Sequence, residues 1–155
     1  MVPNIKFFPK KNLVGKRLSM SFANNRTGEL WKSFMVARNE IKNAVGPNRY
    51  SIQFYDSPLY FQNFNPNTIF EKWAAVEVES FDFVPVGFEK LVLSGGKYAV
   101  FEHKGLSSEI YQYIYGVWLP KSGYILDNRP HFDLLGEKYK QGSENSEEQI
   151  WVPVK

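Results

Sequence analysis

The stretch GKYAVFEH at residues 96–103 decides the fold, because a related stretch stands about 80 residues earlier in the chain. The earlier stretch is GKRLSMSF at residues 15–22. Each begins at a glycine, continues with the alternation typical of a strand, and is followed by a helical pattern. Self-similarity at a fixed spacing is the signature of a repeated structural unit. The chain therefore contains the same unit twice.

Two more pairs of segments keep the same order and nearly the same offset. FYD at 54–56 corresponds to HFD at 131–133. EKWAAV at 71–76 corresponds to QIWVPV at 149–154. Each match is weak alone, but their common order and spacing support a duplication.

Each half reads as strand, helix, strand, strand, which predicts one βαββ unit over about 15–79 and another over about 88–155. Related by pseudo-twofold symmetry, these units form one antiparallel sheet with two main helices that flank a ligand groove. The predicted fold class is α+β, in a single domain spanning residues 1–155. The predicted helices are 27–42 and 107–119, and the predicted strands are 16–22, 50–55, 70–78, 97–103, part of 124–135 and 148–154, with extra strands at Ile5–Phe8 and Phe88–Leu93.

Helical spacing separates a buried stripe from a shoulder on each predicted helix. Two helices that lie side by side turn these shoulders toward a shared groove. The residues expected to face the sheet are Leu30, Phe34, Ala37 and Ile41 on the first helix and Ile110, Ile114 and Val117 on the second. The shoulder residues expected to bind a ligand are Trp31, Met35, Tyr111, Tyr115 and Trp118.

Strand alternation adds a wall to this groove. In the last strand Gln149 and Trp151 share one face, opposite to an aliphatic face, and the first half repeats that parity with Trp73 and Glu77. The aliphatic face suits a packed core, whereas Gln beside Trp suits the wall of a pocket. An alternative stays equally open, namely that these aromatic residues form a core whose polar tips bond to the backbone.

The amino-acid composition limits the classes of function that are possible. The chain has 13 Phe, 9 Tyr and 4 Trp, 17% of its residues, which favours an aromatic pocket because Tyr and Trp combine a flat apolar face with a polar edge. The net charge of +3 and the dispersed Lys and Arg argue against a nucleic-acid surface. Cysteine is absent and the two histidines lack metal-ligand spacing, so we expect no metal or other cofactor. We also expect no membrane span and a cytoplasmic location.

The acidic residues allow several interpretations. By strand parity, Glu71 and Glu77 are the best candidates for a carboxylate in the groove. Asp56 and Asp133 are further acidic candidates because the repeat reproduces them, but this repetition also fits a structural turn role, which is the preferred interpretation. The pair Glu147–Glu148 is interpreted as a solvated start of the last strand, with the alternative that the run 143–148 places a carboxylate near the mouth of the groove.

The second half carries a family signature. It consists of GKYAVFEHKG at 96–105, IYGVWLPKSGY at 114–124, RPHFD at 129–133 and EQIWVPV at 148–154. With FEKWAAVEV at 70–78 in the first half, the chain resembles a standalone GyrI-like domain, the effector-binding domain of AraC-type regulators. The resemblance implies a groove between the helices for a small hydrophobic or aromatic molecule. By this resemblance, the relatives of the chain include proteins that sense drugs, inhibit gyrase or hydrolyse cyclopropane-bearing toxins.

Three departures from the family pattern bear on function. Gln149 stands where relatives carry Glu, Asp133 replaces a second Glu, and Leu135 replaces a Tyr. Gln neither carries charge nor transfers a proton, so we expect a sensor or sequestering protein with no catalytic residue. A toxin hydrolase that uses another carboxylate and a protein-binding inhibitor remain as alternatives. Because the repeat begins near residue 15, we expect no helix-turn-helix and no direct DNA binding.

Overall fold

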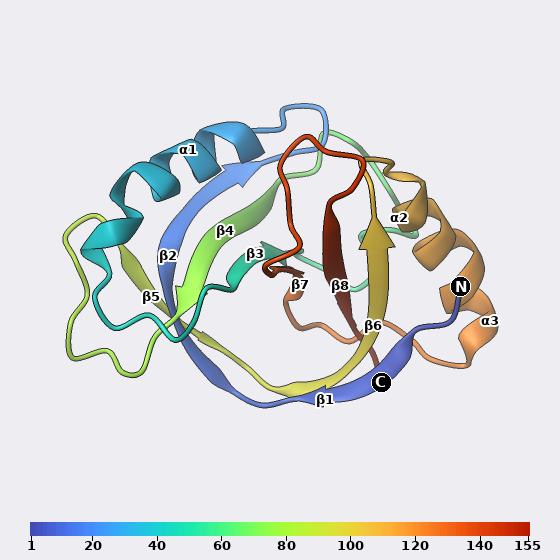
Figure 1. The fold of residues 1–155 in the computed structure, drawn as a ribbon. Coiled ribbons are helices and arrows are strands. Elements are labelled where there is room, and N and C mark those ends of the chain that lie inside the picture. The colour runs from blue at the N-terminus through green and yellow to red at the C-terminus, as the bar shows by residue number, and fades with distance from the viewer.

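The computed structural model describes residues 1–155 as one curled, eight-stranded antiparallel sheet with helices on its outer face (Figure 1). This arrangement confirms the predicted α+β class. The strands are β1 Asn4–Phe8, β2 Lys11–Met20, β3 Arg49–Phe54, β4 Phe70–Glu77, β5 Glu89–Leu93, β6 Gly96–Lys104, β7 His131–Leu135 and β8 Glu147–Pro153. The helical segments are α1 Thr27–Ala37, a 3-10 turn Arg38–Glu40, α2 Glu109–Tyr113, a π turn Ile114–Trp118 and α3 Leu119–Ser122.

The strand order is symmetric about the centre of the sheet. It runs β1-β6-β8-β7-β3-β4-β2-β5, so β6, β8 and β7 mirror β2, β4 and β3. The centre is the antiparallel pair β3–β7, in which Ser51 lies opposite Asp133 and Ile52 opposite Phe132. Both βαββ units are therefore present. The two extra strands predicted from the sequence, β1 and β5, lie at the edges.

Side chains on the concave face of the sheet form a closed interior. Six of them are aromatic, and the rings of Phe132 and Trp151 stack with centroids 5.2 Å apart. Burial of this apolar area supplies much of the driving force for closing the sheet. We call this set the interior cluster: Phe8, Leu13, Tyr50, Ile52, Trp73, Ala75, Leu93, Tyr98, Val100, Phe132 and Trp151.

The helices pack on the opposite, convex face. Leu30 and Phe34 of α1 are fully buried in a cluster that includes Ala74 and Val76 of β4. Ile110 and Ile114 are buried in a cluster with Ile150 and Val152 of β8. The predicted stripe of α1 is confirmed, as are the first two positions of the second stripe.

The second helix widens at the π turn Ile114–Trp118. The N–H of Leu119 donates to the carbonyl of Ile114, five residues earlier, in place of the usual four. The proline at position 120 has no N–H, and its ring would collide with the carbonyl of Gly116 in a regular α-helix. The wider turn relieves this conflict, so the helical segment continues through Pro120 to Ser122, where the sequence predicted an end.

The π turn also shifts the side chains that follow it. The prediction that Val117 faces the sheet is wrong, because the extra residue in the turn leaves Val117 42% exposed. Trp118 takes the inward place, and its ring packs edge-on against Phe101 with centroids 5.1 Å apart. A strict 3.6-residue period cannot represent this displacement.

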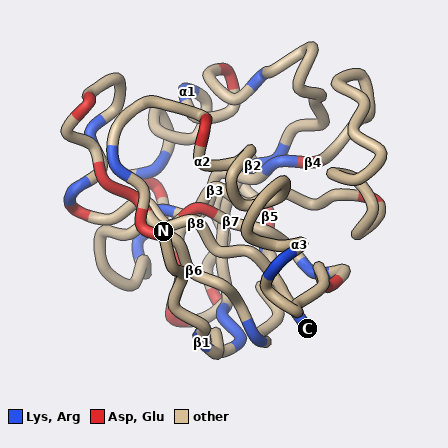
Figure 2. The backbone as a smooth tube through the Cα atoms, turned by 90° about the vertical axis from the view of Figure 1, so that its right-hand side faces the viewer, with Lys and Arg blue, Asp and Glu red and all other residues tan.

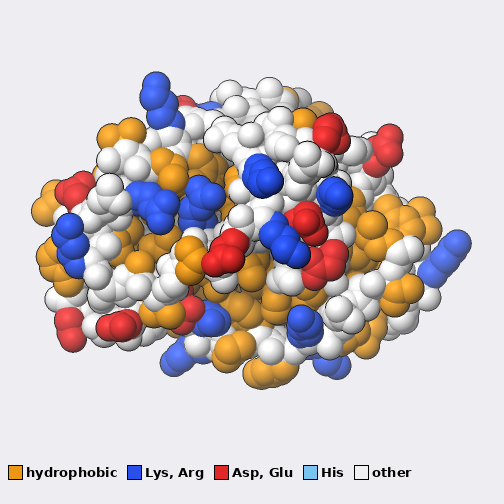
Figure 3. All heavy atoms as spheres, in the orientation of Figure 1, with side chains coloured by type: hydrophobic (Ala, Val, Ile, Leu, Met, Phe, Trp, Pro, Cys, Tyr) orange, Lys and Arg blue, Asp and Glu red, His pale blue; other side chains and the backbone are white.

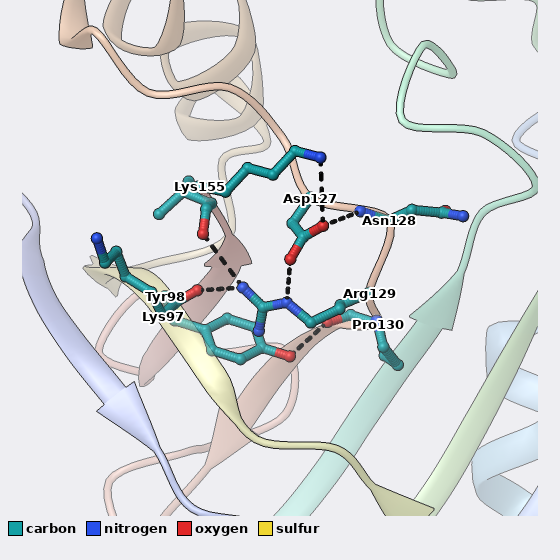
Figure 4. A network of polar contacts seen from close by, with 8 residues as sticks. Lys97, Tyr98, Asp127, Asn128, Arg129, Pro130 and Lys155 are labelled. Carbon is teal, nitrogen blue, oxygen red and sulfur yellow. Dashed lines mark hydrogen bonds and ion pairs between the residues drawn. The ribbon is translucent and has the colours of Figure 1, made fainter.

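A partly buried arginine links β6 to the residue that follows β8 (Figure 4). Arg129 donates to the carbonyls of Lys97 and Val154, and its Nε donates to Asp127 over 2.6 Å. Its guanidinium also lies 4.7 Å from the ring centroid of Tyr98. At Gly96, where φ is +145°, an added Cβ would lie 2.4 Å from Arg129 Nη1, so both the backbone and the arginine require glycine there.

Candidate functional site

A cavity of about 590 Å³ opens on the convex face, between α1 and residues 136–146, which connect β7 to β8. This volume suits a small organic molecule. Figure 3 shows this side of the molecule, where Lys and Arg side chains lie close together beside hydrophobic ones on the left. The lining residues are Thr27, Gly28, Trp31, Lys32, Met35, Arg49, Ser51, Lys72, Asp133, Leu135, Tyr139, Gln141 and Glu148.

Strand alternation explains the polar floor of the cavity. Ser51, Lys72, Asp133 and Glu148 come from four neighbouring strands and have the parity that faces the helices. Beneath α1 and beneath the second helix the same face carries aliphatic residues, which those helices cover. The polar side chains therefore stand in the gap between the two helices.

Two carboxylates lie on the floor, and each has a partner. Asp133 Oδ2 accepts a hydrogen bond of 3.1 Å from the Tyr111 hydroxyl, and Glu148 Oε1 lies 3.1 Å from His103 Nδ1. Burial raises the pKa of Asp133 to about 7, and the Glu148 charge acts in the same direction. Lys72, Tyr111 and His103 oppose this pKa increase. Asp133 thus changes its charge near neutral pH.

Three cations line the same space, and two of them, Lys72 and Arg49, have defined contacts. The Nζ of Lys72 donates to Thr27 Oγ1 over 3.2 Å, and burial lowers the pKa of this amine. The guanidinium of Arg49 lies 5.9 Å from the ring centroid of Trp31 and 5.6 Å from that of Tyr139. The cavity therefore combines aromatic walls with charges of both signs.

The groove beside the second helix is filled by the protein itself. Phe61, from the segment that connects β3 to β4, stacks on Tyr115 with centroids 3.9 Å apart and planes 6° apart. The Tyr115 hydroxyl lies 3.0 Å from His131 Nδ1, and Tyr55 packs edge-on against the same imidazole. Burial lowers the pKa of His131 to about 3, with help from the Arg129 charge. We call this region the filled half of the groove and the cavity beside α1 the open half.

Of the nine residues expected to bind a ligand, two line the cavity, namely Trp31 and Met35. Tyr111 stands at the boundary between the halves, where it touches Asp133, and Tyr115 lies in the filled half. Trp118 packs toward the sheet. A ligand role for these residues stays a prediction.

Four of the nine have the parity opposite to the groove, and the expected pocket wall at this face is wrong in its geometry. Trp73 and Trp151 belong to the interior cluster. Gln149 accepts from the indole of Trp151 and donates to Glu102 over 2.8 Å. Glu77 pairs with Lys11 at 3.0 Å. The sheet curls around this face, so its aromatic residues form a core, as the alternative interpretation allowed.

Sequence reasoning missed several lining residues. Asp133 is a strand residue and Glu148 has a side chain only 18% exposed, so neither the turn nor the solvated interpretation holds. The available signal was their shared parity with Ser51 and Lys72, which places polar residues from four neighbouring strands on one face. Arg49 shares the parity of Ser51 on β3 and so carried the same signal, whereas Tyr139 carried none, because its approach depends on the course of a connecting segment.

Charge and hydropathy add two general observations. Figure 2 shows Lys and Arg distributed along the chain among Asp and Glu, with no single element carrying a basic stripe. None of the helices has the length and apolar composition needed to cross a membrane.

Comparisons with known proteins found similar sequences and similar folds. The transcriptional regulator BrlR of Pseudomonas aeruginosa is 26% identical over 151 residues, which cover 94% of this chain and 53% of BrlR. The chain thus spans about half the length of that relative. Two solved structures share the fold over nearly all of both chains. SAV2435 bound to tetraphenylphosphonium has a TM-score of 0.70 at 19% identity, with 100% and 94% coverage. A hydrolase encoded by lin2189 of Listeria innocua has a TM-score of 0.66 at 14% identity, with 99% and 92% coverage.

A family match covers almost the whole chain. Residues 5–154 match the family described as Cass2, integron-associated effector binding protein. The resemblance to GyrI-like effector-binding domains is confirmed by this match and by the fold. The chain therefore belongs to the Cass2 family of effector-binding proteins.

Proposed function

We propose that this chain binds a small planar aromatic compound in the open half of the groove and acts as a sensor or sequestering module. The observation that carries this proposal is the cavity of about 590 Å³ in a member of an effector-binding family. Trp31, Met35 and Tyr139 offer apolar and aromatic surface, and Ser51 and Gln141 offer hydrogen-bonding groups. The ligand-bound structure of SAV2435 supports the same use of the fold.

The test is to block the cavity without disturbing the fold. A Cβ added at Gly28, which lines the cavity, would meet no atom within 4 Å, so a side chain can be attached there without a clash at its first carbon. Naphthalene-2-carboxamide should bind the wild type saturably in isothermal calorimetry. Gly28→Phe should abolish binding, whereas Gly28→Ala should preserve it. Equal binding by all three proteins would contradict the proposed location.

One observation favours hydrolysis as a second candidate. Asp133, with a pKa of about 7, accepts a hydrogen bond from Tyr111 at the edge of the cavity. A carboxyl group with such a pKa suits general acid/base catalysis, worth roughly 10²–10⁴-fold in rate. Turnover of a cyclopropane-bearing toxin that disappears in Asp133→Asn but survives in Gln149→Ala would support this candidate. Binding without turnover would leave the sensor function.

A further inference from the structure

Three cations line the open half, and none of them makes a close ion pair. They are Lys32, Arg49 and Lys72. None of the ion pairs in the structure, taken at nitrogen–oxygen distances up to 4.0 Å, includes any of them. A cation that faces an enclosed space without a counter-charge attracts an anion more strongly than one in bulk water.

The two carboxylates of the cavity are already engaged by other groups. Asp133 accepts the Tyr111 hydroxyl, and Glu148 faces His103. Even with both acids ionised, the lining carries three positive charges against two negative ones. The unpaired charge of the open half is therefore positive.

Arg49 is the best placed of the three cations. Its guanidinium lies near the rings of both Trp31 and Tyr139, at 5.9 Å and 5.6 Å from their centroids. Its hydrogen bond runs from Nη1 to the sulfur of Met35 over 3.4 Å, and a thioether is a weak acceptor. A guanidinium has five N–H donors in a fork that matches a carboxylate. Most of that fork is free.

We infer that the open half binds an aromatic anion, whose carboxylate or comparable group accepts a pair of hydrogen bonds from Arg49. The ring of the ligand would lie along Trp31 and Tyr139, and Lys32 and Lys72 would add favourable charge. This inference rests on the proposed function and gives it a ligand class. The ligand of SAV2435 is a phosphonium cation, so the groove of this chain differs in the charge that it selects.

The test compares three probes of the same shape and different charge. They are naphthalene-2-carboxylate, naphthalene-2-carboxamide and 2-naphthylmethylammonium. Calorimetry on the wild type at pH 7.5 should give the tightest binding for the carboxylate. Arg49→Gln should weaken the carboxylate by roughly tenfold or more, because hydrogen bonds to a charged group are lost, and should leave the amide nearly unchanged. Arg49→Lys keeps the charge but loses the forked donor geometry. Its affinity for the carboxylate should therefore lie between those of the wild type and Arg49→Gln.

Arg17→Gln is the matched control, because Arg17 lies outside the cavity and pairs with Glu71 and Glu89. It should bind all three probes like the wild type. Thermal melting of each variant checks that the fold survives. Tighter binding of the ammonium probe, or an equal loss for carboxylate and amide in Arg49→Gln, would overturn the charge inference alone. If none of the three probes binds the wild type, both the proposed function and this inference are overturned.

Discussion

The open and filled halves of the groove arise from equivalent parts of a duplicated unit, yet only one has room for a ligand. Trp31 of α1 looks into the cavity, whereas Tyr115 of the second helix is covered by Phe61. The two helices pack on the sheet through similar apolar stripes. The difference therefore comes from what lies above the sheet between the helices.

The cause is the connection between the last two strands of each unit. Residues 55–69 leave the first unit and place Phe61 on the helix of the second. Residues 136–146 leave the second unit and place Tyr139 beside Arg49, close to the helix of the first. The connection 55–69 fills the space that it crosses, whereas the connection 136–146 forms only one wall of the space that it crosses. In this chain the connecting segments thus decide which half of the groove is open, while the repeated elements provide the frame.

The largest expected effect is on stability, which should depend on pH in opposite directions in the two halves. Asp133 has a raised pKa, about 7 against 3.8, so its contribution to folding stability is full below pH 3.8 and is lost as the pH rises through 7. His131 has a lowered pKa, about 3 against 6.5, so its contribution is full above pH 6.5 and is lost as the pH falls toward 3. As the pH rises between these limits in the wild type, the Asp133 contribution to stability falls while the His131 contribution grows. The two changes therefore partly cancel.

Removing one of the two groups should leave only the pH dependence of the unfolding free energy that the other group causes. Between pH 6.5 and 4 the Asp133→Asn variant should lose roughly 2–4 kcal/mol of unfolding free energy, and His131→Asn should gain a similar amount. Urea unfolding at pH 4, 5.5 and 7 measures both. Profiles of the two variants that run parallel to each other would contradict the assignment.

The next effect concerns ligand affinity. Trp31→Ala should weaken binding of a naphthalene probe by roughly thirtyfold, because it removes an aromatic wall worth about 2 kcal/mol. Trp118→Ala is the control, since Trp118 packs on Phe101 away from the cavity, and it should change affinity by less than about twofold. Calorimetry on both variants gives the ratio. A larger loss in Trp118→Ala would place the ligand on the other side of the groove.

A smaller effect is expected from opening the filled half. Phe61→Ala removes the stack on Tyr115 and should cost about 1 kcal/mol of stability beyond the lost burial. It should also admit a ligand too wide for the open half alone, such as a pyrene derivative. Phe64→Ala is a suitable comparison, because Phe64 packs on Phe22 and Tyr60, away from Tyr115. Equal uptake of pyrene by both variants would argue against Phe61 as the filler.

The smallest effect is expected from Gln149→Glu. Because Gln149 faces away from the groove and bonds to Glu102 and Trp151, the new carboxylate would not meet the ligand. Affinities for the three charged and neutral naphthalene probes should stay within about twofold of the wild type. A clear gain for the ammonium probe would mean that ligands reach the interior face.

The sequence predicted the frame better than the site. The two βαββ units, both extra strands and the buried stripe of α1 are confirmed, because periodicity reports directly which side of an element is buried. It misjudged the face with Trp73 and Trp151, since aromatic residues with polar tips suit either a core or a pocket. It placed Val117 wrongly because a π turn breaks the period. Arg49 and Tyr139 meet only through the path of residues 136–146, which local sequence does not specify.

The position of β8 has a consequence for how the molecule folds. This strand, Glu147–Pro153, lies between β6 and β7, so until it is in place the β1–β6 pair has no hydrogen-bonded connection to the rest of the sheet. During synthesis, all seven other strands must emerge before β8 makes the sheet continuous. Pairings so distant in sequence make folding slow, and the edges of β6 and β7 stay exposed to wrong partners meanwhile. Truncations just before residue 147 should therefore accumulate as aggregates rather than as a slightly smaller domain.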